Sequence, residues 1–178
     1  MSNCGIITTP EKDICVYLHM NAGIDSVKPM LLFCKVQGAR SPARDYAGWG
    51  SICQTYGNLI GCGRIGAVVN LYDRMRDLDT DQGTYVIDEE WNIVERIDAP
   101  NEERDPSEDE MMWRIGEFDR NLPERDRLPL EYYRYAVQGR FPEMSYEEIG
   151  YIRRRNATAP SRMKKDIREL FKPADGFR

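Results

Sequence analysis

The pattern of apolar and polar positions predicts a strand and two helices in the first 60 residues. An apolar, β-rich run at 14–20 ends at Asn21-Ala22-Gly23, which predicts a buried strand followed by a turn. Apolar residues fill most positions of 26–37 up to Gly38, where we expect the helix to end. Within 46–60 the apolar residues recur at spacings of three and four, which predicts a second helix.

Shorter apolar runs predict three more strands before residue 100. They cover 66–72, 84–87 and 92–97, and the last two are joined around 88–90 as a hairpin. The expected order of elements is therefore β-α-α-β-β-β, a small mixed sheet with two helices.

After residue 100 the pattern predicts helices only. The polar, acidic stretch 98–109 is a candidate linker. Ser107 and Glu110 have the spacing of a capping box, which predicts a helix from there to Arg120. A further helix is predicted at 129–137.

These elements predict an α+β protein in two parts. Residues 1–100 are expected to form an α/β domain, and residues 101–178 a helical region that ends in a helix pair at 144–172. The length of 178 residues suits one ordinary domain, or a small domain with an appendage.

Composition argues against several classes of site. The five cysteines form no C-x-x-C pair, so neither a disulfide framework nor a zinc site is indicated. With His19 as the single histidine, a catalytic centre built on histidine is hard to assemble, and a structural role is expected for it. We therefore predict no catalytic residue, metal or cofactor. No run approaches the roughly 18 apolar residues of a membrane span, so a cytoplasmic protein is expected.

Charge is sorted along the chain. Residues 71–150 carry 23 acidic and 10 basic side chains, whereas residues 151–178 carry 9 basic and 3 acidic. An acidic stretch is typical of a solvated face or linker, but it is also suited to docking on a basic protein surface. The acidic residues proposed for partner binding are Asp77, Asp79, Asp81, Asp88, Glu89 and Glu90.

The basic C-terminus resembles a helix-turn-helix. Ser145 and Glu148 repeat the capping-box spacing, and the stretch that opens with Ser145 is similar to the first helix of sigma-factor and resolvase modules. The resemblance implies contact with double-stranded DNA. Alternatively, these helices pack on the acidic middle of the same chain. The candidate DNA-binding residues are Arg153, Arg154, Arg155, Arg162, Lys164, Lys165, Arg168 and Lys172.

The turn between the first strand and the first helix resembles a phosphate-binding loop. In the S-G-G-x-D-S loop of ATP pyrophosphatases, glycines let the backbone surround phosphate at a helix N-terminus. Gly23, Asp25 and Ser26 match, whereas Asn21 and Ala22 replace the first serine and glycine. The candidate nucleotide-binding residues are therefore Asn21, Gly23, Asp25 and Ser26, with a simple strand-to-helix turn as the alternative.

Residues 14–97 also resemble small proteins carried by phages and mobile elements of Firmicutes. The motif Y-L-H-x-N-x-G-x-D-S-V begins at Tyr17 and ends at Val27, with Met20 and Ala22 in place of a tryptophan and a glycine. The resemblance implies no enzymatic activity. Some small phage-borne proteins of this kind are anti-CRISPR inhibitors that act in the cytosol of the host bacterium.

The leading hypothesis is therefore a non-enzymatic phage inhibitor of a CRISPR effector nuclease that also contacts DNA. A phage transcription regulator that uses the C-terminal helices is the first alternative, and a nucleotide-binding enzyme that uses the turn at 21–26 is the second. The sequence leaves the oligomeric state open.

Overall fold

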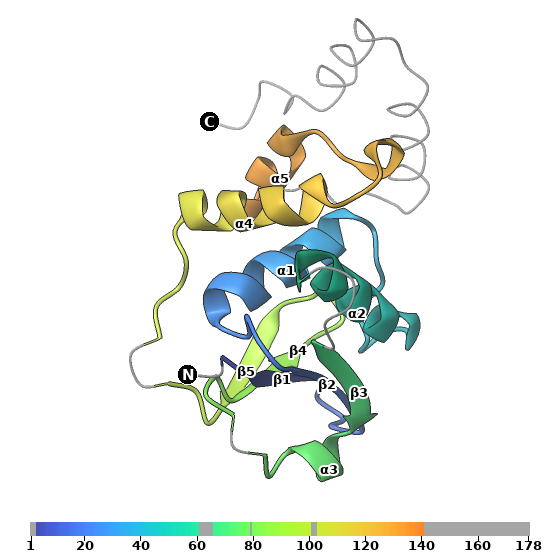
Figure 1. Ribbon diagram of the computed structural model, residues 1–178, viewed down its shortest axis with the longest axis vertical. Helices are drawn as coiled ribbons and strands as arrows, with labels where there is room; N and C mark the ends of the chain where they lie inside the picture. The colour runs from blue at the N-terminus through green and yellow to red at the C-terminus, as the bar shows by residue number, and fades with distance from the viewer. Residues whose placement is uncertain (1–2, 61–65, 79, 101–102, 141–178) are drawn as a thin grey trace, which may run out of the picture.

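The protein has a five-stranded mixed sheet covered by helices (Figure 1). This computed structural model describes residues 3–60, 66–78, 80–100 and 103–140. The strands are β1 (Gly5–Thr8), β2 (Ile14–Leu18), β3 (Ala67–Leu71), β4 (Thr84–Ile87) and β5 (Ile93–Ile97). Their order across the sheet is β3-β2-β1-β4-β5. β1 and β4 run parallel, and the other neighbours in this order are antiparallel.

The longer helices form two further layers on one face of the sheet (Figure 1). Helices α1 (Ile24–Val36) and α2 (Ala47–Ile60) lie closest to the strands. Helices α4 (Glu108–Arg120) and α5 (Leu130–Val137) lie beyond them, and α4 packs along α1. A short 3₁₀ turn, Glu124–Asp126, joins α4 to α5. Helix α1 is therefore buried from both sides, which explains why most of its positions are apolar.

One hydrophobic core joins the sheet to the helices packed around α1. Phe33 on α1 stacks on the Tyr133 ring of α5, with ring centroids 5.4 Å apart, and meets Phe118 of α4 at 5.5 Å. On the sheet side, the same core cluster includes Val16 and Tyr85. The buried residues of α4 and α5 therefore belong to the same hydrophobic core as those of the sheet.

A smaller cluster covers the opposite face of the sheet. Helix α3 (Tyr72–Met75) follows β3 directly and places Tyr72 against Ile6 and Cys15. Among the described residues, no helix has the length and apolar character needed to cross a bilayer.

Most of the expected elements are present, and two were not foreseen. The α+β class, the 88–90 hairpin and the capping box at Ser107 are confirmed. The order β-α-α-β-β-β is incomplete because β1 and α3 are missing from it. β1 is the central strand, yet its four residues hold only Ile6 and Ile7 as apolar side chains, too few for a clear period. The helix pair predicted at 144–172 lies outside the described residues.

Candidate functional site

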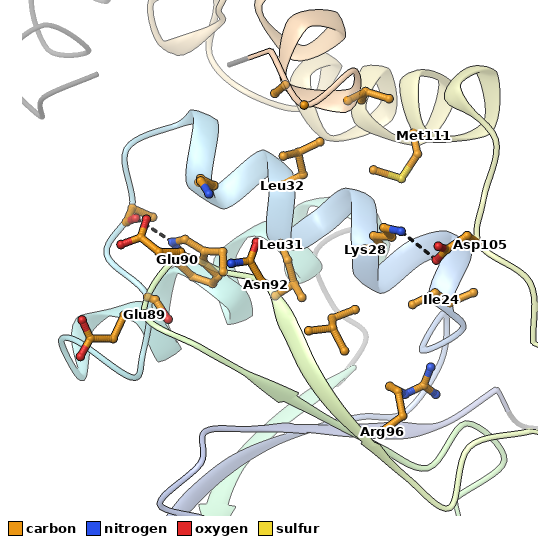
Figure 2. Close-up of a pocket in the computed structure, with 18 of the residues that line it drawn as sticks. Ile24, Lys28, Leu31, Leu32, Glu89, Glu90, Asn92, Arg96, Asp105 and Met111 are labelled. Carbon is orange, nitrogen blue, oxygen red and sulfur yellow. Dashed lines mark hydrogen bonds and ion pairs between the residues drawn. The ribbon is translucent and has the colours of Figure 1, made fainter. Parts of the chain in front are cut away.

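A groove of about 1130 Å³ runs beside α1 (Figure 2). One wall is α1, another is the β4–β5 hairpin, and the end of α5 and the segment before α4 complete it. Apolar side chains form much of its lining, among them Ile24, Leu31, Leu32, Ile93, Met111 and Val137. A groove with apolar surface between packed elements is the usual form of a binding site in a protein.

The charged side chains of the groove are largely paired with one another. Lys28 Nζ lies 2.7 Å from Asp105 Oδ1 at one end, and Glu89 and Glu90 lie at the other (Figure 2). The groove is lined by the basic residues Lys28, Lys35, Arg44 and Arg96 and the acidic residues Glu89, Glu90, Glu103 and Asp105. Because the two signs balance, the groove itself selects neither anions nor cations strongly.

Arg96 fixes the segment that follows β5. Its guanidinium lies over the Tyr85 ring, 3.7 Å from the centroid, and donates a 2.7 Å hydrogen bond to the carbonyl of Gln82. It also forms an ion pair with Glu103, and both side chains are more than four-fifths buried. Through its ion pair with Glu103, Arg96 therefore holds part of the predicted linker 98–109 against the sheet.

The turn of the β4–β5 hairpin is built by Asp88. Its Oδ1 accepts hydrogen bonds of 2.8 Å from the backbone N–H groups of Glu90 and Asn92, and Oδ2 accepts one of 2.9 Å from the Asn92 side chain. Trp91 takes a left-handed conformation with φ of 67°. This geometry leaves the side chains of Glu89 and Glu90 61% and 58% exposed.

The hairpin turn is also fastened to the loop after α1. Trp91 Nε1 donates a 2.9 Å hydrogen bond to the carbonyl of Ala39, and Ser41 Oγ donates one of 2.5 Å to the carbonyl of Asp88. Arg44 Nη2 lies 3.3 Å from a Glu89 oxygen and 3.0 Å from a Glu90 oxygen. Two carboxylates therefore share one guanidinium, and the turn keeps excess negative charge in a fixed position.

The predicted acidic residues occupy two separate segments. Asp77 and Asp81 are exposed on the stretch between α3 and β4, whereas Glu89 and Glu90 are exposed at the hairpin turn. Asp88 is half-buried and its carboxylate is used by the turn. Asp79 lies outside the described residues.

Two tyrosines form hydrogen bonds with the backbone at the start of the turn at 21–26. Tyr56 of α2 exchanges hydrogen bonds with the backbone of Met20, and Tyr85 Oη donates one of 2.7 Å to the carbonyl of Ala22. Ala22 is fully buried, and Asn21 is held with φ of 51°. The structure therefore builds this turn as part of the junction between β2 and α1.

The remaining motif residues sit around the first turn of α1. Gly23 precedes the helix, and a Cβ there would lie 2.6 Å from Asp25 Oδ1. Ser26 Oγ donates a 3.5 Å hydrogen bond to the same carboxylate. Asp25 is 60% exposed and 4.0 Å from Arg114 Nη2. Neither the groove beside α1 nor a smaller one of about 420 Å³ beside Tyr46 is lined by Asn21, Gly23, Asp25 or Ser26.

Two of the described cysteines, Cys15 and Cys34, are buried in the core. Burial raises the pKa of the Cys34 thiol to about 12 and that of Cys15 to about 11, so both stay protonated at neutral pH. His19 is exposed, with the Tyr17 ring 6.1 Å away. Within the described ranges, no three His, Cys, Asp or Glu side chains are grouped so that they could hold a metal ion.

The basic C-terminal candidates fall beyond the last described residue, Arg140. They are Arg153, Arg154, Arg155, Arg162, Lys164, Lys165, Arg168 and Lys172. The groove residues Arg44, Trp91 and Arg96 were not foreseen from the sequence. The only available signal was that Arg96 falls inside the strand predicted at 92–97, which pairs with the buried strand β4.

No protein-family model matches the chain, and comparison with curated proteins and with solved structures also gives no match.

Proposed function

We propose that this protein is a non-enzymatic inhibitor that covers the nucleic-acid-binding surface of a bacterial defence nuclease with its acidic side chains. The observation that carries the proposal is the hairpin turn, where Glu89 and Glu90 project from a fastened backbone around the guanidinium of Arg44. Fixed charges bind better than mobile ones, because less side-chain and loop entropy is lost on binding.

A second exposed acidic group supports the same kind of partner. Asp73 on α3 and Asp77 after it are 81% and 89% exposed, and Arg76 is the cation beside them. Negative side chains repel nucleic acid and are attracted to surfaces rich in lysine and arginine. A protein surface evolved to hold a phosphate backbone has that character.

The partner class follows from the resemblance to small phage-borne proteins. An RNA-guided nuclease holds its heteroduplex in a positively charged channel, which an acidic protein can occupy in place of nucleic acid. In such a complex, the basic residues from Arg153 to Lys172 contact DNA at the edge of that channel.

A pull-down with a purified RNA-guided nuclease, paired with a DNA cleavage assay, tests this function. We expect a complex whose affinity falls as salt is added, and loss of cleavage when the protein is in excess. Full cleavage and no complex across the effector types tested would remove the proposal. Binding of bare duplex DNA without any effect on the nuclease would favour a transcription regulator instead.

The nucleotide alternative has its own test. A ligand that binds only the folded state raises the unfolding temperature by mass action. We expect ATP at millimolar concentration to leave the unfolding temperature unchanged, because neither groove described above is lined by Asn21, Gly23, Asp25 or Ser26. A clear upward shift, lost in Ser26→Ala, would instead support nucleotide binding at this turn.

A further inference from the structure

The two edge strands of the sheet differ in how they meet solvent. β3 and β5 are the outermost strands, at opposite edges. β3 reads Ala-Val-Val-Asn-Leu and holds neither a charged residue nor a proline. Natural sheets usually protect an edge with such residues, because an unprotected edge pairs with other strands.

β5 has the protection that β3 lacks. It carries Glu95 and Arg96, and its pairing with β4 is interrupted by a register shift at Val86/Ile87. Glu95 also forms a 3.2 Å ion pair with Lys12, and Arg96 ties the following segment to the strand through Glu103. An incoming strand would have to disturb these charges.

The hydrogen bonds of β3 show which backbone groups face outward. Tyr72 N–H donates to Asp13, and His19 N–H donates to Gly66, so the even-numbered residues of this stretch pair with β2. The N–H and C=O groups of Ala67 and Val69, and the C=O of Leu71, therefore point away from the sheet. The N–H of Leu71 is bound by the Asn70 side chain at 2.8 Å.

The side chains of β3 are exposed on both faces. Val69 and Leu71 lie on the helix side of the sheet, opposite Val16 and Ile14 of β2, and each is 50% exposed. Val68 lies on the other side and is 40% exposed. Within the part of the chain that the structure describes, α2 and α3 flank β3 but leave these three side chains half open.

We propose that β3 pairs with β3 of a second copy of this chain, antiparallel and about a two-fold axis at Val69. The two Val69 residues then exchange N–H···O=C bonds, and the N–H of each Ala67 meets the C=O of the partner copy's Leu71. Val69 packs beside its symmetry mate, and Leu71 beside Ala67, on the helix side. The product is one continuous sheet of two subunits.

The strand itself argues for an identical partner. It carries no charge, so neither an acidic nor a basic partner gains affinity from it, whereas a second copy supplies matching apolar side chains and backbone groups. The pairing leaves the groove and the hairpin turn free, because both lie at the β5 side of the sheet. A dimer would therefore present two acidic turns at its two ends.

Light scattering coupled to size-exclusion chromatography of the full chain tests the pairing. We expect twice the chain mass for the wild type, and the mass of one chain for Val69→Lys. Val94→Lys is the matched control, since Val94 is a 56% exposed valine on the opposite edge strand and its variant should remain a dimer. A monomeric wild type, or a Val69→Lys variant that stays dimeric, would overturn the proposal. Binding of β3 by another protein while the chain is monomeric would also overturn it.

A smaller substitution tests the same pairing if the lysine variant does not fold. Residues directly opposite in such a pair have Cα atoms about 5.5 Å apart, within the range of a disulfide. Val69→Cys should therefore form a cross-linked dimer on oxidation beyond any formed by the wild type, and Val94→Cys should not. Equal cross-linking in the two cysteine variants would contradict the two-fold pairing at Val69.

Discussion

Two groups of charged side chains beside α1 consist of the same residue types but have different roles. Arg96 and Glu103 are more than four-fifths buried and hold the chain against the sheet. Arg44, Glu89 and Glu90 are half or more exposed, with two acids on one base. Burial and pairing, rather than residue type, therefore decide which charges stabilise the fold and which remain for a partner.

Removal of each arginine should separate the two groups most clearly. We expect Arg96→Ala to lower the free energy of unfolding by about 2–3 kcal/mol, because Glu103 loses its buried partner and Tyr85 its cover. Arg44→Ala should cost less than about 1 kcal/mol, since its ion pairs are exposed to solvent. Chemical denaturation of both variants measures this, and equal losses would show that the burial of Arg96 has no special weight.

A buried acid on α4 gives a smaller effect with a defined sign. Burial raises the pKa of Asp119, although the 3.0 Å hydrogen bond from Tyr133 opposes this. A carboxyl whose pKa is raised on folding binds more protons in the folded state, so its contribution to stability falls as pH rises through that pKa. Asp119→Asn should therefore become more stable relative to the wild type as pH rises from about 4 to neutral.

Unfolding temperatures of the two proteins across this pH range provide the measurement. A constant difference between them would mean that Asp119 titrates alike in the folded and unfolded chain.

An exposed acid at the other end of the same helix should behave in the opposite way. Hydrogen bonds from Arg104 and from the capping residue Ser107 lower the pKa of Glu110 from 4.5 to about 2. The stability that this carboxylate contributes is present above its ordinary pKa and is lost as pH falls through the lowered value. Glu110→Gln keeps a side-chain oxygen for the capping box but removes the charge.

We therefore expect the wild type to lose its advantage over Glu110→Gln as pH falls from above the ordinary pKa of 4.5 to about 2. The amplitude should be the smallest of these tests, because Glu110 is at the surface. Thermal unfolding at several pH values detects it. A stability gap that widens toward low pH would mean that folding raises, rather than lowers, the pKa of Glu110.

The elements with strong local signals could be predicted from the sequence. Ser107 and Glu110 define the start of α4 through their side chains alone, and the acidic turn at 88–90 lies between two clear apolar runs. β1 could not be found in this way, since its place at the centre of the sheet comes from pairing with β2 and β4. Tertiary contacts of this kind leave little trace in a four-residue segment.

The residues of the groove and the hairpin turn could be predicted from the sequence only in part, for a similar reason. Exposed acids such as Glu89 and Glu90 were identified by charge. The carboxylate of Asp88, however, accepts hydrogen bonds within the turn, and the charge pattern does not show this role. The role of Arg96 depends on Tyr85 and Glu103, which are brought together by the hairpin and by the segment after it. Sequence spacing alone does not show which of these side chains meet in space.

The affinity of charge-reversal variants for an RNA-guided nuclease decides whether the acidic hairpin turn is the binding surface. Glu89→Lys/Glu90→Lys should bind at least about tenfold more weakly than the wild type and lose inhibition, because attraction at the hairpin turn becomes repulsion. Glu124→Lys/Glu131→Lys changes the net charge equally at exposed positions near α5, and should weaken binding by no more than about threefold. Equal losses in both variants, or full binding by the hairpin variant, would show that Glu89 and Glu90 do not bind the nuclease.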